Sequence, residues 1–177
     1  GLDVTRAPVD EKHTLRPADM YALSKVQGEE LCQWYAEHYG LNIAILRYSG
    51  IYGMGKNEGA VAHFVKNAMA GVPLEVGRNV LWDIVHVDAV VKANFLAFKK
   101  ISALKFAIFN IGSGQSITVV DLAKKVVRLC KSASRVDVKS KKLALRFTYN
   151  ISKAKKVLCF SPAPIEQGLR RYIKNRV

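Results

Sequence analysis

The stretch ADMYALSKVQGEELCQWYAEHYGLNIAILRY, residues 18–48, places a helical pattern directly before a short apolar strand. Its first part carries apolar side chains at helical spacing, at Leu23, Leu31, Trp34, Tyr35 and Tyr39. Pro17 stands just before this pattern and Gly40 just after it, as expected at the two ends of a helix. We therefore expect a helix over residues 18–39 and a buried strand over Ile43 to Tyr48.

The rest of the chain continues the alternation of helix and strand. Helical patterns cover residues 59–70, 89–99, 119–131 and 152–158, with a last helix opened by Pro164; extended runs cover 82–87 and 106–111. Asp88 and Ser152 stand where helix caps are expected, and Thr118 with Asp121 matches a capping box. Strands that alternate with helices indicate an α/β fold with parallel pairing. Only two or three strands look core-like, fewer than an average sheet has, so we expect an incomplete sheet.

Composition indicates a globular chain with one domain of ordinary size. The chain has 177 residues, half of them apolar, and no apolar run long enough for a membrane helix. The three cysteines are far apart and form no C-x-x-C motif, which favours a reducing, cytoplasmic setting without a disulfide framework. The four histidines show no metal-ligand spacing, so we expect no metal site.

The net charge of +14 raises the question of nucleic-acid binding. The basic residues stand mostly at expected helix ends and surfaces, and no aromatic RNA-binding signature accompanies them. A solvated basic surface is therefore favoured, and we expect no nucleic-acid partner. A missing acidic partner segment is the other interpretation.

Tyr21 and Lys25 carry the most distinctive chemistry. A spacing of four residues places the phenol and the ammonium on one face of the first helix. A nearby cation favours the phenolate, and so brings a tyrosine closer to proton transfer at neutral pH. Tyrosine and lysine at this spacing are also common on exposed helices, so the pair alone decides little.

An ordered series of motifs adds the context. In chain order these are Pro8-Val-Asp-Glu11, Tyr21-Ala-Leu-Ser-Lys25, Gly28-Glu-Glu-Leu31, Leu46-Arg-Tyr-Ser-Gly-Ile-Tyr-Gly53, Gly71-Val-Pro-Leu74, Asp83-Ile-Val-His-Val-Asp88, Phe109-Asn-Ile-Gly-Ser-Gly114, Ser152-Lys-Ala-Lys-Lys-Val-Leu158 and Glu166-Gln-Gly-Leu169. Together they resemble the C-terminal portion of an extended short-chain dehydrogenase/reductase, of the NAD-dependent epimerase/dehydratase family and similar to UDP-glucose 4-epimerases. The resemblance spans nearly the whole chain.

The resemblance implies a fold and a division of the chain. The fold would be an incomplete doubly wound, Rossmann-like parallel sheet with a small C-terminal α/β substrate-binding subdomain. Residues 1–53 would supply the active-site helix and the following strand. Residues 54–177 would form mainly the substrate-binding subdomain, with a core strand near 106–111.

The resemblance also implies roles for single residues. Tyr21 would be the catalytic acid/base; Lys25 would hold the nicotinamide ribose and lower the Tyr21 pKa. The cofactor, NAD or NADP, would be contacted by Tyr21, Lys25, Tyr48 and Ser49. The substrate, a small molecule such as a nucleotide sugar, would be contacted by Gly50, His63, Arg78 and Trp82. The implied enzyme is an NAD-dependent sugar epimerase or dehydratase, an isomerase or a lyase.

Three departures from the family pattern leave alternatives open. The glycine-rich dinucleotide turn is absent from these 177 residues, and so is the Ser or Thr that usually precedes the catalytic Tyr. Ser49-Gly50 stands where Phe-Asn is common, and Trp82 where Arg is common; Arg78 is a candidate replacement. The chain is thus expected to be inactive alone, with a missing N-terminal half or a homo-oligomer as its partner. A dehydrogenase or reductase of the same family, or a split non-catalytic subunit, are the alternatives.

Overall fold

The computed structural model describes residues 8–140 and 142–176. Its helices are α1 (Met20–Tyr39), α2 (Ala60–Met69), α3 (Val87–Leu104), α4 (Val119–Leu129), α5 (Ser152–Leu158) and α6 (Ile165–Lys174). Its strands are β1 (Ile43–Tyr48), β2 (Gly50–Tyr52), β3 (Leu74–Val76), β4 (Asn79–His86), β5 (Phe106–Ile111), β6 (Ser116–Thr118), β7 (Val136–Val138) and β8 (Leu143–Arg146). The predicted α/β class with parallel pairing is confirmed.

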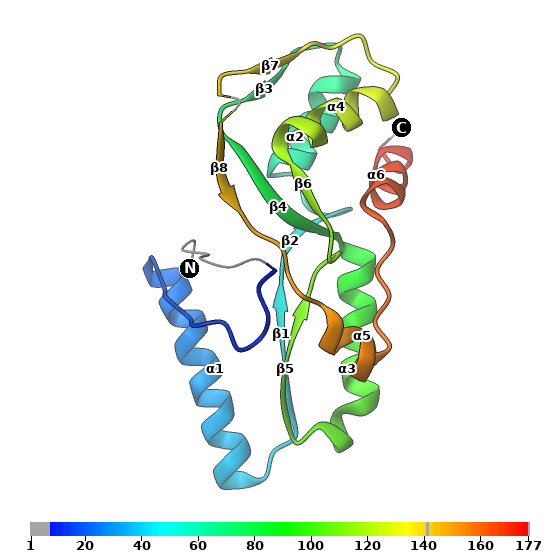
Figure 1. The fold of residues 1–177 in the computed structure, drawn as a ribbon. Helices are drawn as coiled ribbons and strands as arrows, with labels where there is room; N and C mark the ends of the chain where they lie inside the picture. The colour runs from blue at the N-terminus through cyan, green and yellow to red at the C-terminus, as the bar shows by residue number, and fades with distance from the viewer. Residues whose placement is uncertain (1–7, 141, 177) are drawn as a thin grey trace.

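The lower lobe is built on β1 and β5, which pair in parallel from Ile43 opposite Phe106 to Tyr48 opposite Ile111. Helix α1 lies on one face of this pair, and α3 and α5 lie on the other (Figure 1). A core cluster that includes Phe109, Ile111 and Leu158 fills the α3 and α5 side. Among the described strands, β1 pairs only with β5, so its other edge is open.

The upper lobe contains β4, the longest strand, which pairs with β2, β6 and β8. Strands β3 and β7 form a separate parallel pair above it (Figure 1). Helices α2, α4 and α6 contribute to a second core cluster, in which Val65, Leu122 and Leu169 are fully buried. Strand β2 follows β1 after one residue and pairs with β4, so the two lobes meet at the carboxyl end of β1.

The helix ends show which sequence signals decide the boundaries. Asp19 caps α1 by accepting a 2.7 Å hydrogen bond from the Ala22 amide, and Gly40 ends it with φ 65°. Thr118 caps α4 as predicted, accepting from the Asp121 amide at 3.0 Å.

Two cap assignments were wrong. Asp88 lies in the first turn of α3, and His86 is the cap, because its Nδ1 accepts a hydrogen bond from the Asp88 amide. Helix α3 also runs to Leu104 instead of ending at residue 99. Ser152 is the first residue of α5, and its own amide donates to Asn150 Oδ1 at 3.0 Å. In both cases a side chain two residues earlier supplies the acceptor.

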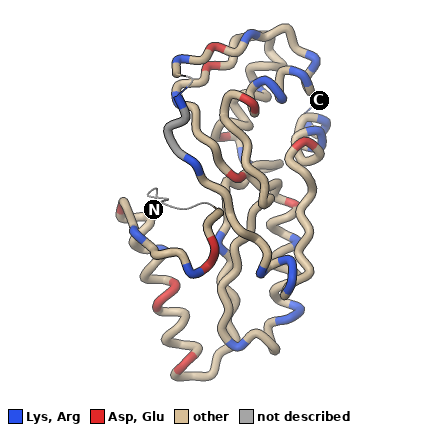
Figure 2. Tube along the Cα trace, in the orientation of Figure 1, with Lys and Arg blue, Asp and Glu red and all other residues tan. Residues whose placement is uncertain are grey.

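Charge is spread over the molecule. Figure 2 shows Lys and Arg on both lobes with Asp and Glu among them. No helix among the described residues is long and apolar enough to cross a membrane.

Candidate functional site

Tyr21 and Lys25 lie together near the start of α1. The Lys25 ammonium stands 5.2 Å from the centre of the Tyr21 ring, and the Tyr21 side chain is 73% exposed. Helix α1 runs antiparallel to β1. The first turn of α1 therefore lies at the level of the carboxyl end of β1 (Figure 1). In open α/β sheets ligands bind at the carboxyl ends of parallel strands. The structure thus brings this predicted pair together at an accessible position.

An ion pair joins α1 to the sheet. Arg47 on β1 binds the Glu29 carboxylate and also donates to the Glu11 backbone oxygen at 3.1 Å. The Glu29 hydrogen bond raises the Arg47 pKa above its ordinary value, so the guanidinium stays charged. The position of the Tyr21–Lys25 pair therefore depends on a contact at the middle of the helix.

Tyr48 faces away from that pair. Its hydroxyl donates to Asn94 Oδ1 on α3 at 3.1 Å, while Arg47, the residue before it, faces α1. Neighbouring residues of a strand point to opposite faces of the sheet. A hollow of about 270 Å³ adjoins Tyr48 between β1 and α3, lined also by Ala44, Leu46, Asn94, Ala97, Phe98 and Ile101.

Ser49 and Gly50 form the turn that carries β1 into β2. Ser49 is buried, and its hydroxyl donates to Asp83 Oδ1 at 3.4 Å. A Cβ on Gly50 would stand 3.3 Å from the Asp83 carbonyl oxygen and from a methyl group of Ile84. Only a small residue therefore lets this turn approach β4 so closely.

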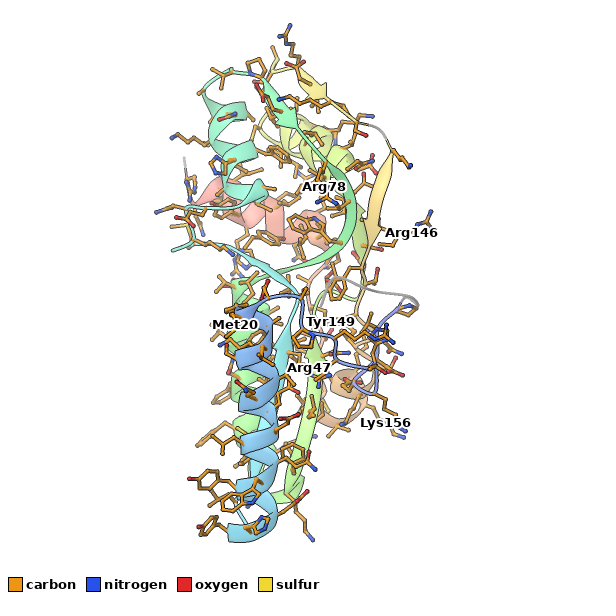
Figure 3. All side chains as sticks on the ribbon, turned by 90° about the vertical axis from the view of Figure 1, so that its left-hand side faces the viewer. Met20, Arg47, Arg78, Arg146, Tyr149 and Lys156 are labelled. Carbon is orange, nitrogen blue, oxygen red and sulfur yellow. The ribbon has the colours of Figure 1, made fainter. Side chains whose placement is uncertain are left out.

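The predicted substrate residues of the upper lobe lie on three different elements. His63 is exposed on α2, and Arg78 is exposed in the turn before β4. Trp82 on β4 is partly buried against the upper core cluster, and its indole N–H has no hydrogen-bond partner among the described residues. Figure 3 shows Arg78 in the upper lobe, well above Arg47. The structure does not gather these three side chains around Tyr21 and Lys25.

Asp83 is the site residue that the sequence did not reveal. It is 1% exposed, and its carboxylate accepts hydrogen bonds from Ser113, Gly114, Tyr149 and Ser49. Burial raises the Asp83 pKa, and the hydrogen bonds from Ser113 and Gly114 oppose that shift. A carboxylate inside an apolar run, Trp82-Asp-Ile-Val, was the available signal, because a buried charge requires donors.

The turn bound by Asp83 borders an open polar hollow of about 460 Å³. Its lining consists of Pro8, Gly114, Thr148, Tyr149, Asn150, Ile151, Ser152 and Lys155. Burial raises the pKa of Tyr149 to about 12, so this phenol stays protonated at neutral pH. Figure 3 shows Tyr149 and Arg47 at the junction of the lobes, near the start of α1.

The last candidates are His86 and a metal site. His86 is buried, but only its Nδ1 is hydrogen-bonded; its Nε2 has no partner among the described residues. Within residues 8–140 and 142–176, no group of three or more His, Cys, Asp or Glu side chains is placed to hold a metal ion.

Comparison with known proteins gives a consistent result. A family model described as "NAD dependent epimerase/dehydratase family" matches residues 3–112. UDP-glucuronate 4-epimerase 3 of Arabidopsis thaliana is 29% identical over 196 residues, covering 98% of this chain and 45% of that protein. A putative UDP-glucose 4-epimerase of Methanocaldococcus jannaschii is 37% identical over 121 residues, covering 65% of this chain and 38% of that protein.

Solved structures agree over almost the whole chain. UDP-glucose 4-epimerase of Thermotoga maritima, solved with UDP-glucose, is 27% identical with a TM-score of 0.85, covering 98% of this chain and 58% of that one. UDP-N-acetylglucosamine 4-epimerase of Bacillus cereus is 27% identical with a TM-score of 0.84, covering 99% of this chain and 59% of that one. The chain spans about half the length of the curated relatives that it matches.

Proposed function

Because this chain belongs to the NAD-dependent epimerase/dehydratase family and has its Rossmann-like fold, we propose that it supplies the acid/base and substrate side of an NAD(P)-dependent nucleotide-sugar epimerase or dehydratase. The observation that carries the proposal is the Tyr21–Lys25 pair, exposed at the carboxyl end of β1. We also propose a cytoplasmic location.

Tyr21 moves the proton in this proposal. In its phenolate form it accepts the proton of a sugar hydroxyl, and in its phenol form it returns a proton to the oxygen. Lys25, whose ammonium stands 5.2 Å from the centre of the Tyr21 ring, would hold the nicotinamide ribose. The cofactor, when bound, supplies the hydride chemistry.

The residues present fit only part of a dinucleotide. Tyr21 and Lys25 are accessible, whereas the Tyr48 hydroxyl is bonded to Asn94 and the Ser49 hydroxyl to Asp83. Among the described residues, the glycine-containing turn at this end of the sheet, Gly112 to Gly114, leads into β6 and not into a helix N-terminus that could receive a pyrophosphate. We therefore propose that this chain contacts the nicotinamide end of NAD or NADP and is not competent alone.

The proposed substrate is inferred from the names of the relatives that this chain matches. The relatives described above are named for acting on UDP sugars, and the Thermotoga structure was solved with UDP-glucose. We propose that Gly50, His63, Arg78 and Trp82 border the substrate, with residues 54–177 forming mainly the substrate-binding subdomain. A dehydrogenase or reductase of the same family would use the same Tyr21 and Lys25.

A second candidate, a split non-catalytic subunit, is favoured by two observations. None of the 20 residues of α1 is buried, and β1 has an open edge in the described part of the chain. Both features are expected where another polypeptide segment packs. Such a subunit would bind that segment without turning over substrate.

Reconstitution separates the two candidates. The chain is mixed or fused with the dinucleotide-binding half of a relative, and interconversion of UDP sugars and reduction of bound dinucleotide are measured. Turnover supports the enzyme. Formation of a stable complex that binds dinucleotide but shows neither reaction supports the non-catalytic subunit.

A further inference from the structure

The Asp83 carboxylate accepts hydrogen bonds from residues that follow both strands of the lower lobe. Its Oδ1 accepts from the Ser113 amide and the Ser113 hydroxyl, both at 2.7 Å, and from the Ser49 hydroxyl at 3.4 Å. Its Oδ2 accepts from the Gly114 amide at 3.0 Å and the Tyr149 amide at 3.4 Å. Ser49 directly follows β1, and Ser113 and Gly114 follow β5.

The backbone of the turn after β5 approaches the Asp83 carboxylate closely at Gly112. A Cβ on Gly112 would stand 2.6 Å from Asp83 Oδ2, well inside any normal contact. Gly114 has φ 65°, a left-handed conformation that glycine adopts without strain. Gly112 therefore allows the turn after β5 to approach the carboxylate, and Gly114 allows the turn its left-handed conformation.

We propose that Asp83 is the positioning residue of this site: from the upper lobe it fixes the turn after β1 and the turn after β5 relative to each other. The inference rests on the proposed function only in so far as Gly50, which follows Ser49 in the chain, borders the substrate. Asp83 is almost fully buried, so it acts on the site through other residues. It acts through the Ser49 hydroxyl and the backbone of Ser113 and Gly114.

The chemistry of the five donors explains why a carboxylate is needed. An ionised carboxyl group only accepts hydrogen bonds, whereas an asparagine amide presents two donors on one side. In Asp83→Asn, an NH2 group at the Oδ2 position would face the Gly114 and Tyr149 amides, which cannot turn away. At the Oδ1 position it would face the Ser113 amide. A longer Glu side chain would drive its carboxyl group against Gly112.

The test is amide hydrogen exchange, followed residue by residue by NMR on the 177-residue chain. Asp83→Asn is compared with Leu122→Ala, a matched control that destabilises the chain from a fully buried position in α4. We expect D83N to accelerate exchange of the Ser49, Ser113 and Gly114 amides at least tenfold more than exchange of the Ile45 amide in the middle of β1. In L122A the exchange rates of these four amides should increase by similar factors.

Two outcomes would overturn the proposal. One is a uniform acceleration in D83N, as in L122A, which would make Asp83 a structural residue only. The other is acceleration at Ser113 and Gly114 with no effect at Ser49, which would confine its role to one turn. If D83N does not fold, Asp83→Ser is used in its place, with the same expected pattern.

The proposed function is tested separately in the same samples. UDP-glucose is added to the unsubstituted chain, and the amide signals of Ser49 and Gly50 are followed. Absence of any shift would count against those two residues as ligand contacts. It would leave the exchange result for Asp83 unaffected.

Discussion

The Glu29 carboxylate and the Arg47 guanidinium form a two-point ion pair between α1 and β1. The Nε–Oε1 distance is 2.8 Å and the Nη2–Oε2 distance is 2.5 Å, and the side chains are only 19% and 14% exposed. Since α1 has no buried residue, this pair is a principal link between the helix that carries Tyr21 and the sheet. Bidentate pairs of this kind give geometric specificity as well as energy.

We expect Glu29→Gln to lower the free energy of unfolding by about 2–3 kcal/mol, because it leaves a largely buried guanidinium without its counter-charge. Urea denaturation measures the loss. The matched control is Arg135→Ala, which breaks a pair whose side chains are 76% and 40% exposed and should change stability by less than about 0.5 kcal/mol. Equal effects of the two substitutions would contradict the assigned role of the Glu29–Arg47 pair.

Stability should depend on pH through His86. Burial lowers the His86 pKa below its ordinary value of 6.5, with Asp88 opposing and Arg171 reinforcing the shift. Between the two pKa values the unfolded chain binds more protons than the folded one, so stability is lost as the pH falls below about 6.5. Protonation of Nδ1 also removes the acceptor for the Asp88 amide.

The measurement is urea denaturation from pH 8 to pH 5, with His86→Asn as the reference, because asparagine retains a side-chain acceptor at a helix cap. The difference in stability between the unsubstituted chain and H86N should shrink as the pH falls through this range. A difference that stays constant, or grows toward acid pH, would show that His86 is not buried neutral.

Dinucleotide affinity of the isolated chain should be low. The sequence contains no glycine-rich turn at a helix N-terminus for the pyrophosphate, and in the proposed function Tyr21 and Lys25 contact only the nicotinamide end. Calorimetric titration with NAD and with NADP should give a dissociation constant on the order of 1 mM or weaker. A micromolar dissociation constant would contradict this prediction, because it would mean that other residues of the chain bind the pyrophosphate.

The chain should associate with itself or with another segment. Leu31, Trp34, Tyr35 and Tyr39 of α1 are 42–64% exposed, and burying each such side chain is worth about 1.5–3 kcal/mol. Light scattering during size exclusion should show a mass that rises with concentration, and Trp34→Lys should reduce the rise more than the exposed control Gln27→Lys. A constant 19.7 kDa with a cooperative thermal transition would refute this prediction.

Sequence patterns predicted α1, β1 and β5 well, but the bounds of β4 and α3 less closely. Strands β1 and β5 have the expected bounds, residues 43–48 and 106–111, because each is an apolar run ended by a turn. Helix α1 differs from the expectation only at its start. The three-residue strands β2, β3, β6 and β7 were not predicted, since three residues are too few to show an alternation.

The candidate site was predictable only in part. The pairing of Tyr21 with Lys25 follows from helical periodicity, which is a local property. The five donors around Asp83 come from residues 30 to 66 positions away in the chain. Such a contact is set by how β4 packs across the ends of β1 and β5, and no local pattern encodes it.

The central claim is that Tyr21 transfers the proton, and one measurement tests it most directly. Turnover of UDP-glucose or UDP-glucuronate is compared between the unsubstituted chain, Tyr21→Phe and Tyr39→Phe, each reconstituted with the dinucleotide-binding half of a relative. Tyr39 is the control, an exposed tyrosine at the far end of the same helix. We predict that Y21F lowers turnover by about 10²–10⁴-fold while thermal stability is retained and Y39F is unaffected. Full turnover in Y21F would contradict the account.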